Sequence, residues 1–192
     1  MKRFPVVFDL ETKHTFREFS EPEKLGVTVL SLYDYGTGKE SIYTEKELSG
    51  ALRIFENASY LVGYNINGFD LPVLKPYYAG DISYFLTLDI LEDIRIKIGH
   101  RISLNDVAST TLNKKKSGHG LQAIDFYKEG KWDELKKYCL DDTLITKELF
   151  DFGLKYKEIH YMTPTGRSII RVDWEKYMEE SGKSETHMTL PF

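Results

Sequence analysis

The chain has 192 residues, which suits one domain of ordinary size and is too short for two full domains. Its hydrophobic fraction of 41% predicts a packed globular fold, and its net charge of −4 lacks the basic signature of many nucleic-acid-binding proteins. The single cysteine, Cys139, excludes an internal disulfide and favours a reducing compartment. Because no stretch approaches the roughly 18 apolar residues of a membrane span, we expect a cytoplasmic protein.

The N-terminal half of the chain predicts strands and helices in alternation. Residues 4–10 are nearly all apolar and rich in Val and Phe, which is typical of a central strand buried on both faces. Residues 27–35 and 40–44 are rich in strand-forming residues and flank a glycine-containing turn, which predicts a hairpin. Similar patterns predict a helix over 45–57, a short strand over 60–64 and a helix over 70–78.

The C-terminal half continues with a predicted strand over residues 83–90 and a helix over 91–98 that ends at Gly99. Ser103 opens a further short helix. Residues 113–120 (NKKKSGHG) are polar and basic, which predicts a surface loop. The longest helical pattern runs over residues 131–157.

A terminal hairpin is predicted over residues 161–172, with its turn at 163–166 (TPTG). We therefore expect a single domain over residues 1–175, with its core at about 4–152, and a polar, flexible tail over 176–192.

Three patterns carry candidate chemistry, and the first is a pair of carboxylates at the end of the first strand. Period-2 alternation puts Asp9 and Glu11 on one face, about 6–7 Å apart along the strand. Like charges at that spacing repel unless divalent cations neutralise them. The alternative is a solvated strand end.

The second pattern is residues 62–70 (VGYNINGFD), in which Asp70 follows a buried strand. Asp70 alone could be an ordinary helix N-cap. Asn65 and Asn67 could instead reach the sugar or phosphate of a nucleic acid, and Phe69 could stack on a base.

The third pattern is residues 138–142 (YCLDD) on the long predicted helix. Positions i and i+4 share a helix face, so Tyr138 and Asp142 can point into one cleft, while Asp141 is rotated away by about 100°. Each pattern alone has an ordinary structural explanation. Their joint occurrence in this order, on strand end, strand-to-helix turn and helix, favours a functional site.

Together the patterns resemble the three motifs of the DEDD superfamily of exonucleases, which includes polymerase proofreading domains, ribonuclease D and ribonuclease T. Asp9-x-Glu11 resembles the first motif, and residues 63–70 resemble the second motif of family B DNA polymerase proofreading domains. Tyr138-x-x-x-Asp142 resembles the third motif in its tyrosine (DEDDy) form. The histidine subgroup would carry His five residues before the last Asp, where this chain has Lys137.

The resemblance covers residues 4–152 and implies a ribonuclease H-like α/β fold, in which a mixed sheet with an antiparallel second strand is flanked by helices on both faces. It implies a 3′→5′ exonuclease that hydrolyses the terminal phosphodiester bond with two divalent cations, Mg²⁺ or Mn²⁺. DNA is favoured over RNA as substrate, with a single-stranded 3′ end and a role in DNA repair.

Residue roles follow from the resemblance and from the chemistry of such a site. Asp9 is expected to bridge the cations, with Glu11, Asp70 and Asp142 as further ligands, and Tyr138 is expected to orient the attacking water. The expected substrate contacts are Leu10, Thr12, Asn65, Phe69, Lys114, Lys115 and Lys116. The three lysines could equally be a solvated run.

Two other functions are compatible with the sequence. A ribonuclease H-like endonuclease or junction resolvase would share the fold, and so would a non-catalytic adaptor that binds nucleic acid. Residues 187–192 (HMTLPF) also resemble the short motif by which bacterial repair and replication enzymes attach to the sliding clamp, with His187 where Gln is usual. A sliding clamp is therefore a candidate partner.

Overall fold

The computed structural model describes residues 2–114 and 120–178. The main sheet contains β1 (Val6–Thr12), β2 (Val27–Asp34), β3 (Lys39–Thr44), β4 (Leu61–Gly63) and β5 (Thr87–Asp89), and a separate hairpin contains β6 (Glu158–Thr163) and β7 (Gly166–Arg171). The α-helices are α1 (Leu48–Asn57), α2 (Asp70–Leu74), α3 (Ile90–Ile98), α4 (Leu104–Leu112), α5 (Gly120–Lys128) and α6 (Trp132–Tyr156).

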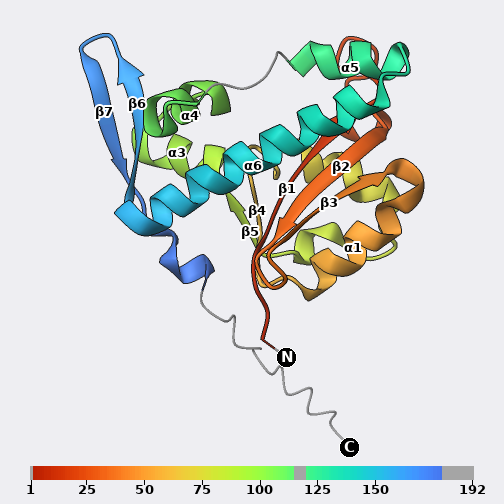
Figure 1. Cartoon of the computed structure of the whole chain (residues 1–192), viewed down its shortest axis with the longest axis horizontal. Coiled ribbons are helices and arrows are strands. Elements are labelled where there is room, and N and C mark those ends of the chain that lie inside the picture. Colours follow the sequence, from red (N-terminus) through yellow and green to blue (C-terminus); the bar gives the residue numbers. More distant parts are fainter. Residues whose placement is uncertain (1, 115–119, 179–192) are drawn as a thin grey trace, which may run out of the picture.

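The main sheet has the order β3-β2-β1-β4-β5 (Figure 1). β2 runs antiparallel to both of its neighbours, whereas β1, β4 and β5 are parallel to one another. The expected mixed sheet with an antiparallel second strand is therefore confirmed. Because parallel strands end at the same edge, the residues that follow β1, β4 and β5 meet there.

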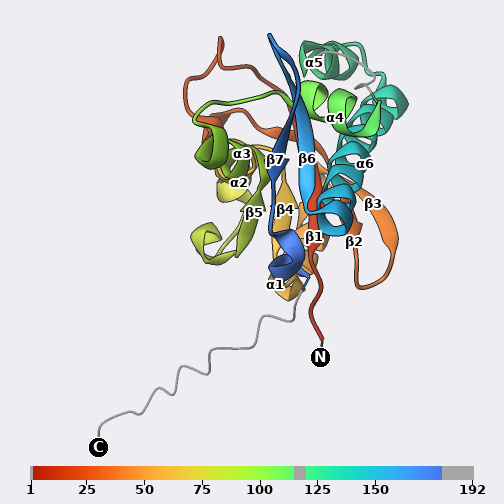
Figure 2. The same ribbon diagram turned by 90° about the vertical axis from the view of Figure 1, so that its left-hand side faces the viewer.

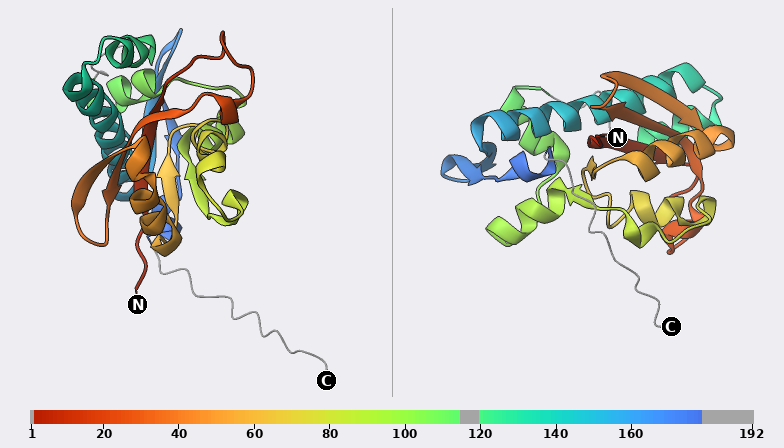
Figure 3. Two further views of the ribbon diagram at one scale, coloured as in Figure 1. Left: turned by 90° about the vertical axis from the view of Figure 1, so that its right-hand side faces the viewer. Right: turned by 90° about the horizontal axis from the view of Figure 1, so that it is seen from below.

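Helices cover both faces of the sheet, as expected (Figure 3). Alternation along β1 sends Phe8 and Leu10 into the core beneath α1 and α2, while Val7 packs into the core that contains Leu149 of α6. Asp9 and Glu11 have the same parity as Val7, so the same alternation directs them to the face covered by α6.

Several element boundaries differ from the sequence prediction for local reasons. The predicted helix over 70–78 changes from α2 to a 3-10 turn at Lys75–Tyr77, because Pro76 lacks the N–H that an α-helix needs. The strand predicted over 83–90 is shorter in the structure, where β5 covers Thr87–Asp89. Asp81 accepts a hydrogen bond from the Ser83 N–H and caps a 3-10 turn at Ile82–Tyr84, which takes up the start of the predicted strand.

Other differences concern the ends of elements. The first strand begins at Val6 and reaches Thr12, because its pairing with β2 continues to Val27. α5 begins inside the stretch for which a loop was predicted. The hairpin β6–β7 begins at Glu158, three residues earlier than predicted. A short 3-10 helix, Trp174–Tyr177, follows it and lies below the hairpin in Figure 2, with Trp174 buried. No described helix is long and apolar enough to cross a membrane.

Candidate active site

The site begins with the pairing of β1 and β2. Asp9 lies opposite Ser31 in the register, and Glu11 lies opposite Val29. The pairing shifts between Glu11 and Thr12, which marks the end of regular pairing at this edge of the sheet. Both carboxylates are half-buried on the face that α6 covers.

A buried polar cluster holds α6 over Asp9. The Ser31 hydroxyl donates to the backbone oxygen of Cys139 at 2.9 Å and lies 2.5 Å from the Thr143 hydroxyl. Ser31, Cys139 and Thr143 are fully buried, so these contacts are shielded from water. Because the bonded residues flank Asp142 on the helix, they bring this carboxylate to the strand that carries Asp9.

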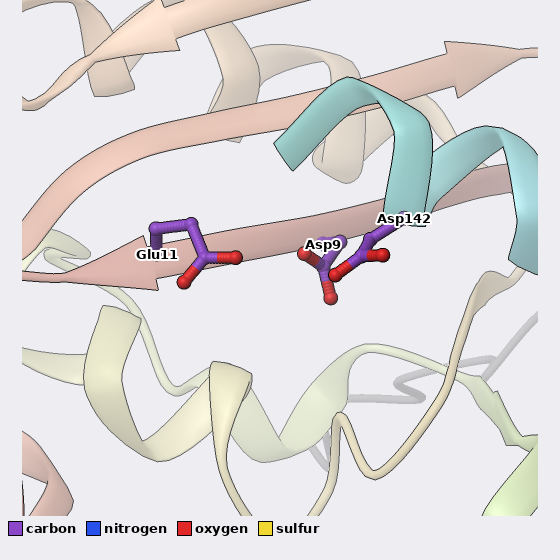
Figure 4. Close-up of side chains that lie close together, drawn as sticks. All are labelled: Asp9, Glu11 and Asp142. Carbon is purple, nitrogen blue, oxygen red and sulfur yellow. The ribbon is translucent and has the colours of Figure 1, made fainter. Parts of the chain in front are cut away.

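The result is a group of three carboxylates, those of Asp9, Glu11 and Asp142 (Figure 4). One oxygen of each lies within 4.8 Å of the others, and Asp142 is 1% exposed. Such a concentration of negative charge repels itself strongly. Oxygen-only ligands suit hard divalent cations such as Mg²⁺ and Mn²⁺, so the donor set fits the expected metals.

Asp70 approaches β1 from the segment that follows β4, the strand on the opposite side of β1 from β2. It is the first residue of α2, and its Oδ1 accepts a hydrogen bond from the Leu10 N–H at 3.2 Å. The N-cap of α2 is Phe69, so the alternative of Asp70 as an ordinary N-cap is wrong. Asp70 is 2% exposed and fixed to β1 between the two acidic residues.

A cavity of about 430 Å³ joins these parts. All five residues predicted to be catalytic line it, namely Asp9, Glu11, Asp70, Tyr138 and Asp142. Four of the predicted substrate contacts line it as well, namely Leu10, Thr12, Asn65 and Phe69. Phe16, from the loop that follows β1, meets Phe69 edge to face with ring centroids 5.7 Å apart.

Tyr138 keeps its proton in this setting. Burial is the largest cause that raises the pKa of its phenol, and the charges of Asp142, Glu11 and Asp9 raise it further. The residue is 4% exposed. Its hydroxyl is therefore suited to donate a hydrogen bond inside the cavity rather than to act as a base.

Of the lysines predicted to contact substrate, Lys114 does not line the cavity. Lys114 instead pairs with Glu148 of α6, with the Nζ atom 2.6 Å from a carboxylate oxygen. Lys115 and Lys116 lie outside the described residues, as do residues 187–192, on which the clamp prediction rests.

Sequence reasoning missed Asp89, the residue that organises the segment 65–70. Its Oδ1 accepts the Asn65 N–H at 2.8 Å and its Oδ2 accepts the Asn67 N–H at 3.0 Å. It also accepts the first N–H groups of α3, from Leu91 and Glu92. An Asp before an apolar helix signals an N-cap, but nothing local reveals its second set of bonds.

Arg101 was also missed. Its guanidinium donates to Oδ1 of Asn65 at 2.7 Å, while the Asn65 backbone has the left-handed φ of 69°. Arg101 and Asn65 line a second cavity of about 360 Å³ that shares Asp9 with the first. A lone Arg between a glycine-ended helix and a Ser cap gives no sequence signal of this role.

Comparisons with known proteins agree with the fold. The chain matches part of the family B DNA polymerase from the hyperthermophilic archaeon Pyrobaculum calidifontis, with a TM-score of 0.58 and 18% sequence identity. The match covers 82% of this chain and 26% of that chain, so this chain spans about a quarter of the polymerase. No curated protein matches the chain. A family model described as RNase_H superfamily matches residues 6–152, and the chain therefore belongs to the RNase H superfamily.

Proposed function

We propose that this chain is a metal-dependent 3′→5′ exonuclease of the tyrosine subgroup of DEDD enzymes, acting on single-stranded 3′ ends of DNA in preference to RNA. The observation that carries the proposal is the meeting of Asp9, Glu11 and Asp142 within 4.8 Å, in one cavity with Asp70 and Tyr138. Membership of the RNase H superfamily supports a nuclease. The likeness to a family B DNA polymerase fits the motif resemblance and favours DNA.

The four acidic residues are assigned to cation binding. Asp9 is central, because it lies beside both Glu11 on its own strand and Asp142 on α6. Two Mg²⁺ or Mn²⁺ ions held there would stabilise the charge that develops at the scissile phosphate and lower the pKa of a bound water. Asp70 completes the set from α2, where its bond to the Leu10 N–H fixes its position.

The remaining residues orient the reactants. Tyr138 donates its hydroxyl hydrogen to the attacking water or to a phosphate oxygen, since a phenol with an ordinary pKa of about 10 is protonated at neutral pH. Phe69 offers a flat face to the terminal base, and Thr12 and Asn65 offer polar groups to its sugar and phosphate. Leu10 contributes an apolar wall.

The test is digestion of 5′-labelled DNA and RNA oligonucleotides, each with and without Mg²⁺ or Mn²⁺. We expect a ladder of products shortened one nucleotide at a time from the 3′ end, only with metal. A substrate with a blocked 3′ end should resist, whereas internal cleavage of it would identify an endonuclease. Binding without any cleavage would identify an adaptor.

Asp142→Asn and Asp141→Asn form a matched pair for this test. Asp142 belongs to the carboxylate group, whereas its neighbour Asp141 pairs with Lys137 on the surface at 2.6 Å. We expect Asp142→Asn to remove activity and Asp141→Asn to keep it, with both proteins folded. Full activity of Asp142→Asn would refute the assignment.

A further inference from the structure

A third cavity, at the same edge of the sheet, has the chemistry of a nucleotide-binding cleft. This cavity, of about 370 Å³, is called the lysine–tryptophan cleft here, and its walls include Lys13, Glu45, Lys46, Tyr127, Trp132 and Lys136. It contains three lysines against one acidic residue, in a protein whose net charge is −4. Its positive charge is therefore local and differs in sign from the whole molecule.

Two of the lysines have charge to offer. Lys13 is bound to Glu45, with the Nζ atom 2.7 and 2.6 Å from the two carboxylate oxygens. This pairing neutralises the acidic residue in the wall. Among residues that the structure describes, no carboxylate oxygen lies within 4.0 Å of the Lys46 or Lys136 ammonium group. Lys136 and Lys46 act on Glu47 and Glu45 only through space, as causes that lower the pKa of those carboxyls, so both ammonium groups can meet an external anion.

The cleft also has an aromatic surface. Trp132 is 41% exposed, although it is a large apolar side chain. Its ring meets that of Tyr127 at 5.6 Å and 84°, an edge-to-face contact that holds the indole in place. An ordered and exposed indole is suited to stack on a flat ring, because little side-chain freedom is lost on binding.

The cleft shares three elements with the candidate active site. On α5, Ile124 lines the active-site cavity and Tyr127, one turn later, lines the cleft. At the end of β1, Thr12 lines the active-site cavity and Lys13 lines the cleft. On α6, Tyr138 lies six positions after Trp132, which is about 9 Å of helix. Figure 1 shows α5 beside the N-terminal end of α6 at this edge.

We propose that the lysine–tryptophan cleft binds the single-stranded nucleic acid on the 5′ side of its two 3′-terminal nucleotides. A base stacks on Trp132, and Lys46 and Lys136 contact backbone phosphates. The inference rests on the proposed function, because it assigns the cleft to the same strand whose 3′ end enters the cavity of Asp9. A flat, anionic ligand matches both the aromatic and the cationic walls.

The test is fluorescence anisotropy with a labelled dT12 strand in EDTA, so that the strand remains intact. Trp132→Ala should weaken binding at least about fivefold, the lower end for loss of one base stack, and Trp132→Phe should recover much of it. The double variant K46Q/K136Q should lower the slope of log affinity against log salt by about 1.4, or about 0.7 for each phosphate contact.

The matched control is K39Q/K155Q, which removes the same charge elsewhere. Lys39 begins β3 and therefore lies at the opposite edge of the sheet, and Lys155 is near the far end of α6. We expect this variant to bind dT12 like the parent protein. Equal effects of the two double variants on dT12 binding would refute the cleft. So would unlabelled poly-glutamate of the same charge, if it displaced the labelled strand as well as unlabelled dT12 does.

Kinetics separate this inference from the proposed function. Cleavage of a dinucleotide, which is too short to reach the cleft, should have the same kcat/KM in Trp132→Ala and in the parent protein, while KM for dT12 rises. Equal loss on both substrates would refute the cleft. If the parent protein digests nothing, the proposed function fails, and anisotropy still decides whether the cleft binds a strand.

Discussion

The network around Asp89 predicts a large effect from a small substitution, Asp89→Asn. The carboxylate accepts four backbone N–H groups, at 2.8, 3.0, 3.1 and 3.3 Å, and the residue is 6% exposed. Asparagine keeps one acceptor oxygen and places an NH₂ group where the second oxygen was. At least one N–H then loses its acceptor, and the remaining bonds are no longer made to a charged group.

The expected cost follows from these bonds. A hydrogen bond to a charged group contributes about 1.5–3 kcal/mol and a neutral one about 0.5–1.5 kcal/mol. Losing one bond and weakening the others should lower the free energy of unfolding by about 3 kcal/mol. Because Asn65, Asn67 and Asp70 lie on the segment that Asp89 holds, we also expect kcat/KM to fall about 10- to 100-fold through misplacement of the site.

Urea unfolding followed by tryptophan fluorescence measures the first effect, and steady-state nuclease assays measure the second. Asp81→Asn is the matched control, because Asp81 caps a 3-10 turn through the Ser83 N–H at 2.9 Å but is exposed and remote from the cavity. It should cost no more than about 1 kcal/mol. If Asp89→Asn were as mild as Asp81→Asn in both assays, the four bonds would not organise the site.

Three further predictions concern the site itself. Tyr138→Phe should lower the single-turnover rate constant less than Asp142→Ala, because it removes one donor hydroxyl whereas the other change removes a carboxylate assigned to metal binding. Arg101→Gln should raise KM for oligonucleotides about tenfold, because it removes a positive charge that can contact the strand beside Asn65. The control Arg95→Gln, which removes a charge already paired with Glu92, should leave KM unchanged, and equal KM values for the two variants would contradict a contact between Arg101 and the strand. Chelation by EDTA should stop cleavage reversibly, which restoration of the product ladder by added Mg²⁺ would verify.

Local patterns predicted much of the fold. A nearly continuous apolar run rich in Val and Phe predicted β1, and the i, i+4 spacing placed Tyr138 and Asp142 together on one face of α6. The antiparallel second strand came only from the family resemblance, and the order of the strands was not predicted, because pairing between distant segments leaves no periodic signal. α5 was missed since it is short and adjoins a glycine-containing polar stretch.

The site shows the same division between local and distant causes. Alternation put Asp9 and Glu11 on one face, but the approach of Asp142 depends on Ser31, which bonds residues 108 and 112 positions away in sequence. Likewise, Asp89 accepts hydrogen bonds from Asn67 and Asn65, which lie 22 and 24 positions earlier. Nothing in the sequence around these two residues indicates that Asp89 is their partner. Such long-range bonds are fixed by packing rather than by local preference.

The burial of Cys139 between β1 and α6 allows a chemical probe to report on the candidate active site. Its sulfur lies 3.5 Å from the Asp9 backbone oxygen, and it is the only thiol in the chain. An alkylating reagent can reach it only when the helix separates from the strand, and that same separation parts Asp142 from Asp9. The rate at which the protein gains the mass of one label, recorded by mass spectrometry, therefore reports how often this centre comes apart.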